Sequence, residues 1–333
     1  MLKVLHISFH KGCQNDLEYI SKKLNFNLEF ISYSDETVKG GDVYNITHER
    51  AENNWIKYKD YYNSFDIIIT SDTAPLSRIF LQNNFQKKLI IWICNRFDYA
   101  HQPDAQKIGF PDKEYYDLIN DVKNRPNVSI IGYTPFETYY ANNIRKLDIG
   151  NECIKPIGKI GDVYKTYIST KVEDKKNTFI ISPYHNENIY MNLYEKLKSL
   201  NIKCYNNKYD GPNDLAEFAG VIHLPYAWSN LAFFEALHLD IIYFIPSKKF
   251  FMELYKKKCN DHYWFQDSFC IDKLELCEWY QKEHKDILVY FDSWDDLKNK
   301  INNLDYKKQR KQINFFSKIH ENNMLEKWDK FIK

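Results

Sequence analysis

The sequence has almost no net charge and no long apolar run. Its 46 basic and 45 acidic side chains leave a formal charge of +1, and the lysines are scattered along the chain. Because binding to a phosphate backbone needs a concentrated positive surface, no nucleic acid is expected as a partner. A membrane-spanning helix needs roughly 18 consecutive apolar residues, and no stretch approaches that length, so we expect no transmembrane segment.

Paired cysteines and a secretion signal are also missing. The seven cysteines are an odd number and include no C-x-x-C pair, which argues against a disulfide framework and against a cysteine-rich zinc site. The apolar start of the chain is interrupted at His10 and Lys11, which is too early for the core of a signal peptide. These features predict a cytoplasmic protein with reduced thiols.

Several ligand-binding motifs are absent. The chain has no G-x-G-x-x-G and no G-x-x-x-x-G-K-[ST], so neither a dinucleotide site nor a P-loop is predicted. It also lacks H-E-x-x-H and the EF-hand loop pattern. We therefore expect no dedicated metal site and no bound cofactor.

What the sequence does contain is an alternation of short apolar runs with helical patterns. The predicted strands cover residues 3–9, 27–33, 65–72, 88–95 and 127–134 in the first half, and 178–184, 202–207, 220–226, 240–247 and 286–293 in the second. Two helical patterns, at about 294–303 and 307–332, close the chain. Near-continuous apolar strands followed by helices are typical of parallel sheets buried on both faces. With a linker-like segment at 153–165, the 333 residues predict two α/β domains.

The clearest candidate for a binding site is the segment His223–Leu237. Pro225 and Tyr226 end a predicted strand, Ser229 stands at the predicted N-cap of a helix, and Glu235 follows among apolar residues. A helix N-terminus binds phosphate, and Ser229 and Asn230 add hydrogen-bond donors. A carboxylate at this rim of a sheet accepts hydrogen bonds from the two cis hydroxyls of a ribose. The alternative is a capped core helix whose glutamate pairs with a lysine, and these residues leave both interpretations open.

A family resemblance rests on residues 218–247, FAGVIHLPYAWSNLAFFEALHLDIIYFIPS. The order of strand, proline, polar turn, helix with Glu-Ala, strand and Pro-Ser resembles the donor-binding segment of GT-B-fold nucleotide-sugar glycosyltransferases. The resemblance extends loosely over the whole chain and implies an α/β GT-B fold, with two Rossmann-like domains whose parallel sheets face a central cleft. It implies an acceptor domain at 1–155, a donor domain at 156–310, and a last helix at 311–333 that crosses back to the first domain.

The resemblance also implies an activity, the transfer of a sugar from a nucleoside diphosphate donor to a hydroxyl of a glycan or glycoconjugate, without a metal. The donor-binding residues would be Tyr184, His185, Pro225, Tyr226, Ser229, Asn230 and Glu235, and cations for the diphosphate could come from Lys155, Lys159 and Lys248. Tyr184 and His185 have a plain turn as their alternative interpretation. Many retaining members carry a second glutamate eight residues before the first, whereas this chain has Ala227. The departure leaves the stereochemistry open, together with two alternatives: a nucleotide-sugar epimerase and a non-catalytic nucleotide-sugar-binding protein.

The first half offers candidates for catalysis and for acceptor binding. His10 follows the first predicted strand, and an imidazole suits the removal of a proton from a sugar hydroxyl. Asp72 ends another strand and is either a second candidate base or a helix cap. The loop after residue 94 is either an ordinary surface loop or the acceptor site, with Asn95, Arg96, Asp98, Tyr99 and His101. A peripheral membrane contact stays open, because a lipid-linked acceptor needs only a modest basic or aromatic patch.

Overall fold

The computed structural model describes residues 1–31, 46–94, 97, 112–159, 172–181, 192–207, 209, 211–258 and 271–333. Contacts between Cα atoms divide the chain into two compact units. The first unit contains Met1–Pro156 together with Asn323–Lys333, and the second contains Ile157–Asn322. Each unit has its own five-stranded sheet, in which every pairing is parallel, as the apolar strand patterns predict.

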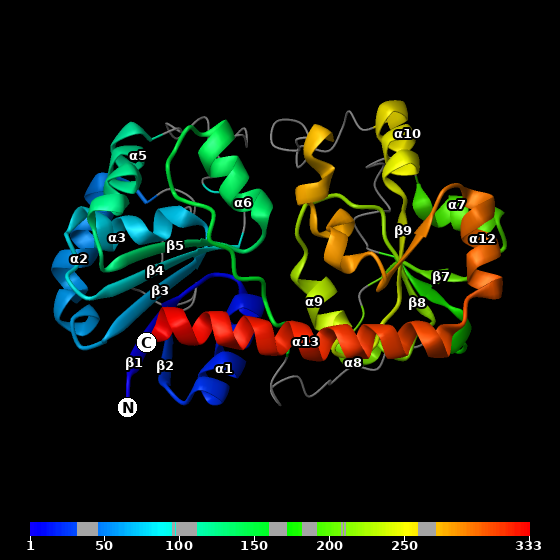
Figure 1. Cartoon of the computed structure of the whole chain (residues 1–333), viewed down its shortest axis with the longest axis horizontal. Coiled ribbons are helices and arrows are strands. Elements are labelled where there is room, and N and C mark those ends of the chain that lie inside the picture. Colours follow the sequence, from blue (N-terminus) through cyan, green and yellow to red (C-terminus); the bar gives the residue numbers. More distant parts are fainter. Residues whose placement is uncertain are drawn as a thin grey trace. The chain divides into compact units, whose positions relative to one another are not determined.

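The first sheet has the order β2-β1-β3-β4-β5. Its strands are β1 (Lys3–Ile7), β2 (Asn27–Ile31), β3 (Ile67–Asp72), β4 (Lys88–Ile93) and β5 (Val128–Gly132). Its helices are α1 (Lys11–Leu24), α2 (His48–Tyr62), η1 (Ala74–Ser77), α3 (Arg78–Gln82), α5 (Lys113–Asn120), η2 (Asp121–Asn124), α6 (Pro135–Tyr139) and the π turn η3 (Tyr140–Ile144). The helices α2, α3 and α5 lie together on one face of the sheet and α1 lies on the other (Figure 1), as right-handed crossovers require.

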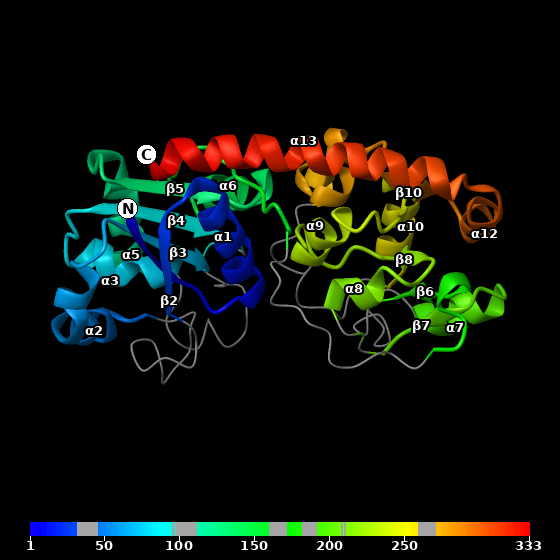
Figure 2. The ribbon, with the colours of Figure 1, turned by 90° about the horizontal axis from the view of Figure 1, so that it is seen from below.

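Tryptophan side chains join the end of the chain to the first sheet. Trp92 of β4 is fully buried, and the ring of Trp328 meets it edge-on at a centroid distance of 5.1 Å. The red C-terminal end of the last helix (Tyr306–Ile332) lies beside the first sheet (Figure 2). The indole Nε1 of Trp92 donates a hydrogen bond to the carbonyl oxygen of Ile154 at 2.9 Å. Cys153 forms a parallel bridge with Gly132 at the end of β5. The start of the segment predicted as a linker is therefore built into the first unit.

The second sheet has the order β10-β9-β8-β6-β7. Its strands are β6 (Phe179–Ile180), β7 (Cys204–Tyr205), β8 (Gly220–Ile222), β9 (Tyr243–Pro246) and β10 (Leu288–Phe291). Its helices are η4 (Lys175–Asn177), α7 (Leu193–Ser199), α8 (Gly211–Leu215), α9 (Leu231–Leu237), α10 (Lys248–Lys258), η7 (Ile271–Leu276), η8 (Glu278–Tyr280), η9 (Lys282–His284), α12 (Trp294–Asn303) and α13 (Tyr306–Ile332). Both closing helices, α12 and α13, agree with the sequence prediction. The Ser293 side chain caps α12 and accepts from the N–H of Asp296 at 3.1 Å, so the acidic 292–296 segment is a helix start.

No helix in the described parts of the chain combines the length and the apolarity that crossing a membrane requires.

Candidate functional site

The topology marks one place in each sheet where a ligand can bind. In the first unit the chain turns from β2 on one side of β1 to β3 on the other, and in the second unit β7 and β8 flank β6 in the same way. Ligands of parallel sheets bind outside the carboxyl ends of the strands at such a switch point. The segments that follow β1, β3 and β8 are therefore the candidate sites.

The turn after β8 connects two of the predicted donor-binding residues. Pro225 is buried and Tyr226 is half-buried. The side chain of Asn230 accepts a hydrogen bond from the N–H of Ala232 at 3.0 Å, and its Nδ2 atom is 3.3 Å from the hydroxyl oxygen of Tyr226. Asn230 is thus the N-cap of α9, and the prediction that Ser229 is the cap is wrong. Asn and Ser cap helices about equally well, so their order in the sequence did not decide which of them takes this position.

A second segment fixes the backbone of this turn. The indole Nε1 of Trp279 donates to the carbonyl oxygen of Ala227 at 3.1 Å, and the N–H of Glu278 donates to the carbonyl oxygen of Trp228 at 2.9 Å. Trp228 is itself only 4% exposed. The turn that carries Tyr226 and Ser229 is consequently held at both of its central residues.

Glu235 is half-buried, whereas its apolar neighbours suggested a buried carboxylate. Phe233, Phe234 and Ala236 are fully buried, and the 100° step between helical residues turns Glu235 away from them. Burial, and then the negative charge of Glu235, raise the pKa of Tyr209. The carboxylate of Glu235 thus interacts electrostatically with the phenol of Tyr209, a residue that the sequence did not single out.

Aromatic rings line the strand ends beside this turn. The ring of His223 lies 4.3 Å from that of Trp279 and 5.4 Å from that of Tyr226, measured between centroids. Tyr243 of β9 lies 5.7 Å from Trp279, and its phenol has a pKa raised well above the usual value by burial. Trp279, His223 and Tyr243 are buried and pack against one another beneath the turn, so of the four rings only the half-buried Tyr226 can contact a ligand. Trp279 and Tyr243 are distant in sequence from the turn, so no local pattern pointed to them.

Gly158 allows the backbone that follows the first unit to approach α9 closely. Its φ is +79°, and a Cβ atom there would lie 2.3 Å from the carbonyl carbon of Phe234 and 2.6 Å from the nitrogen of Glu235. A side chain at this residue would be excluded both by the backbone angle and by the contact. His238, at the end of α9, lies with its Nε2 2.8 Å from the carbonyl oxygen of Ile157. The position of the Glu235 helix therefore depends on residues 157–158.

In the first unit, His10 and Asp72 both lie at the carboxyl ends of neighbouring strands. His10 is exposed and occupies the N-cap of α1 without capping it through its side chain. Asp72 ends β3, is 6% exposed and has a φ of +83°. A left-handed backbone is costly for a residue other than glycine and is concentrated at functional sites. The N-cap after β3 is Thr73, so the alternative interpretation of Asp72 as the helix cap is wrong.

Two cysteines that the sequence did not single out join this pair. A hydrogen bond from the thiol of Cys94, followed by a hydrogen bond and the positive charge of His10, lowers the pKa of Cys13 to about 6, against burial and the charge of Asp72. Burial raises the pKa of Cys94 well above its usual value. Cys13, Cys94, His10 and Asp72 therefore form one cluster, called here the thiol cluster. Throughout the described residues, no group of three or more His, Cys, Asp or Glu side chains is arranged to hold a metal ion.

The three candidate cations occupy different surroundings. Lys159 forms an ion pair with Glu321 at 2.7 Å, and Lys155 is buried within the first unit. Lys248 is exposed at the start of α10, directly after β9. Of the three, Lys248 lies at the carboxyl edge of the second sheet.

Seven of the predicted site residues lie outside the described part of the chain. They are Tyr184 and His185 of the donor set, and Asn95, Arg96, Asp98, Tyr99 and His101 of the acceptor set.

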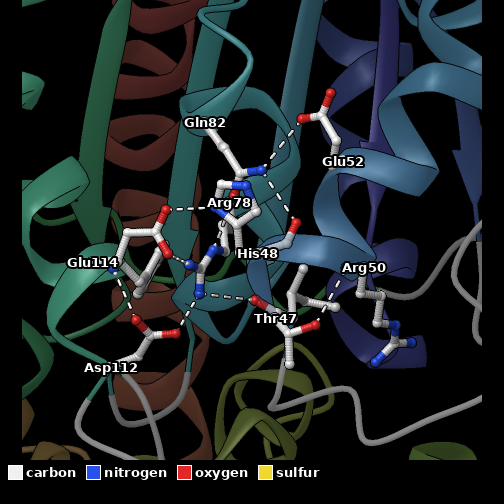
Figure 3. Close-up of polar contacts among 10 residues, drawn as sticks. Thr47, His48, Arg50, Glu52, Arg78, Gln82, Asp112 and Glu114 are labelled. Carbon is white, nitrogen blue, oxygen red and sulfur yellow. Dashed lines mark hydrogen bonds and ion pairs between the residues drawn. The ribbon is translucent and has the colours of Figure 1, made fainter.

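A buried arginine forms an ion-pair network with two carboxylates in the first unit (Figure 3). The Arg78 side chain is 2% exposed, forms an ion pair with Asp112, and lies 2.6 Å from Glu114. It also donates to the carbonyl oxygen of Ile46 at 3.2 Å, and Nδ1 of His48 lies 2.5 Å from Glu114. Because the guanidinium is paired with two carboxylates, the network is structural, and it ties the starts of α2, α3 and α5 together.

Comparison with known proteins gives a structural likeness without sequence similarity. No protein-family model matches the sequence, and no curated protein matches it. The glycosyltransferase SnogD from Streptomyces nogalater aligns with 100% of this chain and 99% of its own, at 7% identity and a TM-score of 0.52. CalG4, the calicheamicin glycosyltransferase, aligns with 99% of this chain and 98% of its own, at 8% identity and a TM-score of 0.46. UGT89C1 from Arabidopsis thaliana, complexed with UDP, covers 100% of both chains at 10% identity with a TM-score of 0.46.

The likeness to SnogD extends over both units, and each unit contains a five-stranded parallel sheet with helices. The predicted α/β fold is therefore confirmed: the chain has the GT-B fold of two Rossmann-like units.

Proposed function

We propose that the protein is a glycosyltransferase that moves a sugar from a nucleoside diphosphate donor to a hydroxyl group of a glycan or glycoconjugate. The observation that carries the proposal is the hydrogen-bonded turn after β8, which holds Tyr226 and Asn230 next to the Glu235 helix at a switch point. The GT-B fold supports the proposal, because SnogD, which shares this fold, is a glycosyltransferase.

In the proposed donor site, the half-buried carboxylate of Glu235 accepts hydrogen bonds from the two ribose hydroxyls. The phenol of Tyr209 stays protonated, because burial and Glu235 raise its pKa, and it can donate a further hydrogen bond. The hydroxyl of Ser229 is a donor for the diphosphate, whereas Asn230 already accepts from the N–H groups of Ala232 and Phe233 at the start of α9. Lys248 would supply positive charge to the leaving group.

In the proposed chemical step, His10 takes the proton of the acceptor hydroxyl while the bond between sugar and diphosphate breaks. The positive charge that forms on His10 is favoured by its interaction with Cys13, because a charged His10 lowers the pKa of that thiol. Asp72 is the second candidate base, and it lies in the same cluster.

The donor site is tested by thermal shift with UDP, GDP, TDP and CMP and their common sugars. A ligand at about 100 times its Kd stabilises the folded state by roughly 2.7 kcal/mol. We expect one nucleotide to raise the melting temperature, and Glu235→Ala to abolish that shift. Glu253→Ala, which changes an exposed glutamate of α10, is the matched control and should keep it. The proposal fails if no nucleotide stabilises the wild type.

Product analysis separates transfer from the alternatives. Release of the nucleoside diphosphate that depends on an acceptor supports a transferase, whereas a change of sugar configuration without an acceptor supports an epimerase. Ala227 favours a third possibility, a binding protein without turnover, because a glutamate of retaining enzymes is missing there. Donor binding without release of nucleotide under any acceptor would establish that role.

We further propose that the reaction takes place in the cytoplasm and needs no metal ion. The location is supported by the five described cysteines, none of which forms a disulfide. Transfer that continues undiminished in the presence of a chelator would support the metal-independent reaction, and loss of transfer that added Mg²⁺ restores would contradict it.

A further inference from the structure

One face of α13 exposes large apolar side chains. Among the residues that the structure describes, five large apolar side chains are exposed, and two of them are on this helix. Phe315 is 69% exposed and Ile319 is 45% exposed. Since they are four residues apart, they lie side by side on one face of the helix. The helix α13 is the long orange-to-red helix of Figure 1. A single exposed apolar residue is ordinary, but a pair on a charged helix is a small patch.

The same face is strongly basic. From Tyr306 to His320 the helix has five lysine or arginine residues and no aspartate or glutamate. At 100° per residue, Lys308, Lys311 and Lys318 fall within about 60° of Phe315. These three lysines are exposed. The opposite face is buried and is formed by Gln309, Ile313, Ser317, His320 and Met324.

Three acidic residues lie near this face, and none of them forms an ion pair with its lysines. Asp240 lines a hollow beside the helix together with Lys307, Arg310 and Phe315, but its carboxylate accepts from Nδ2 of Asn314 at 3.1 Å. The other two neighbours are also occupied. The carboxylate of Asp305 accepts from the backbone N–H of Lys308 at 2.9 Å, and Glu321 pairs with Lys159 at 2.7 Å. Asp240 and Asp305 keep their negative charge, because both accept from neutral donors, but no described carboxylate forms an ion pair with Lys308, Lys311 or Lys318, so these three cations can approach a partner.

We infer that this face of α13 docks on a membrane surface that contains anionic lipids. The lysines would approach the lipid headgroups, while Phe315 and Ile319 enter the boundary with the acyl chains. A nucleic acid or another polyanion would use the positive charges but would leave the two apolar side chains in water. A lipid surface accounts for both kinds of residue on one face.

Vesicle flotation of the full chain tests the inference. We expect binding to vesicles of phosphatidylcholine mixed with phosphatidylglycerol, no binding to phosphatidylcholine alone, and weaker binding at high salt. The variant with Lys308→Gln, Lys311→Gln and Lys318→Gln should bind on the order of a hundredfold more weakly, because each cation near an anionic surface contributes about one factor of five. Phe315→Ser with Ile319→Ser should weaken binding by about tenfold.

A matched control is available on α2. Ile56 is 63% exposed and is followed by the exposed Lys57 and Lys59. Ile56→Ser with Lys57→Gln and Lys59→Gln should leave vesicle binding unchanged. All of these residues are exposed, so unchanged melting temperatures check that the variants fold.

Three outcomes would overturn the inference: no binding of the wild type to anionic vesicles, equal binding to both kinds of vesicle, or full binding by the Phe315→Ser, Ile319→Ser variant. In the last case, binding to heparin beads that only the lysine variant loses would identify a general polyanion site. The vesicles contain no nucleotide, so these results are independent of whether the proposed donor site exists.

Discussion

The two units share one topology and differ in the chemistry at its edge. The strand order of the first sheet is β2-β1-β3-β4-β5. Taken in the same direction, that of the second sheet is β7-β6-β8-β9-β10, so in both sheets the second strand of the unit lies at the edge, beside the first. At the carboxyl edge, the first unit carries the thiol cluster, whereas the second carries the aromatic rings around Trp279 and the carboxylate of Glu235. Topology thus determines where a site can form, and side chains determine what it can do.

The units also differ in how their backbones are held. The first sheet has strands of five or six residues, and β3 and β4 are almost entirely buried. The strands of the second sheet have only two to four residues. Its binding turn depends on side chains from distant segments, such as the indole of Trp279, which donates to the carbonyl oxygen of Ala227. We therefore expect changes in the second unit to disturb its binding turn more readily.

The largest expected effect is a loss of catalytic rate when the first unit is changed, without a loss of nucleotide binding by the second unit. His10→Ala should lower kcat by about 10² to 10⁴, the usual contribution of a general base, and should leave the nucleotide-induced thermal shift unchanged. Steady-state kinetics and thermal shift measure the two properties. His48→Ala, at another histidine with a half-exposed side chain, is the control and should be fully active. Equal loss of activity in both variants would exclude a specific role for His10.

Next in size is the loss of the buried arginine in the first unit. Arg78→Met should destabilise that unit on the order of 3 kcal/mol, because Asp112 and Glu114 lose their cation. Hydrogen exchange should rise in β3 and β4 and stay unchanged in β8 and β9. Lys22→Met removes a pair in which the lysine side chain is 60% exposed, and it should cost less than about 1 kcal/mol. Uniform exchange over both units would show that they unfold as one.

A smaller loss of stability is expected from Gly158→Ala in the second unit. The left-handed φ and the contact with the Phe234 backbone should cost about 2 kcal/mol and displace α9. We expect both a lower melting temperature and a weaker nucleotide-induced shift. Gly150→Ala, at a glycine with a φ of +74° and no atom within 4 Å of the added Cβ, isolates the backbone cost. If the two variants behave alike, the close contact with α9 is unimportant.

A pH dependence of stability is the last expected effect, and it belongs to the first unit. The pKa of Cys13 is lowered from 9.0 to about 6 in the folded protein, so between these values the unfolded chain binds more protons. Stability should therefore rise with pH in this window, by up to about 1.4 kcal/mol per pH unit, and the contribution is lost as the pH falls through 6. Denaturant titrations of wild type and Cys13→Ser measure the slope.

The slope should disappear in Cys13→Ser and shrink in His10→Ala, because the hydrogen bond and charge of His10 contribute to the lowered pKa. Cys204→Ser, which removes a thiol whose pKa is raised by burial, should keep the rise between pH 6 and 9. An unchanged slope in Cys13→Ser would assign the titration to another group.

The sequence by itself determined the parallel sheets, the two closing helices and the place of the turn after β8. These features follow from local patterns: apolar runs, helical spacing and a proline at a strand end. The same patterns indicated His10 and Asp72, because His10 directly follows a predicted strand and Asp72 ends another.

Only the tertiary structure decided which side chains meet there. Cys13 and Cys94 are joined across the ends of strands that are far apart in sequence, and Trp279 reaches the carbonyl of Ala227 across a similar distance. It also decided that Asn230 caps α9 and that Glu235 is half-buried. The physical reason is that hydrogen bonds, burial and pKa shifts depend on neighbours in space, whereas periodicity records only neighbours along the chain.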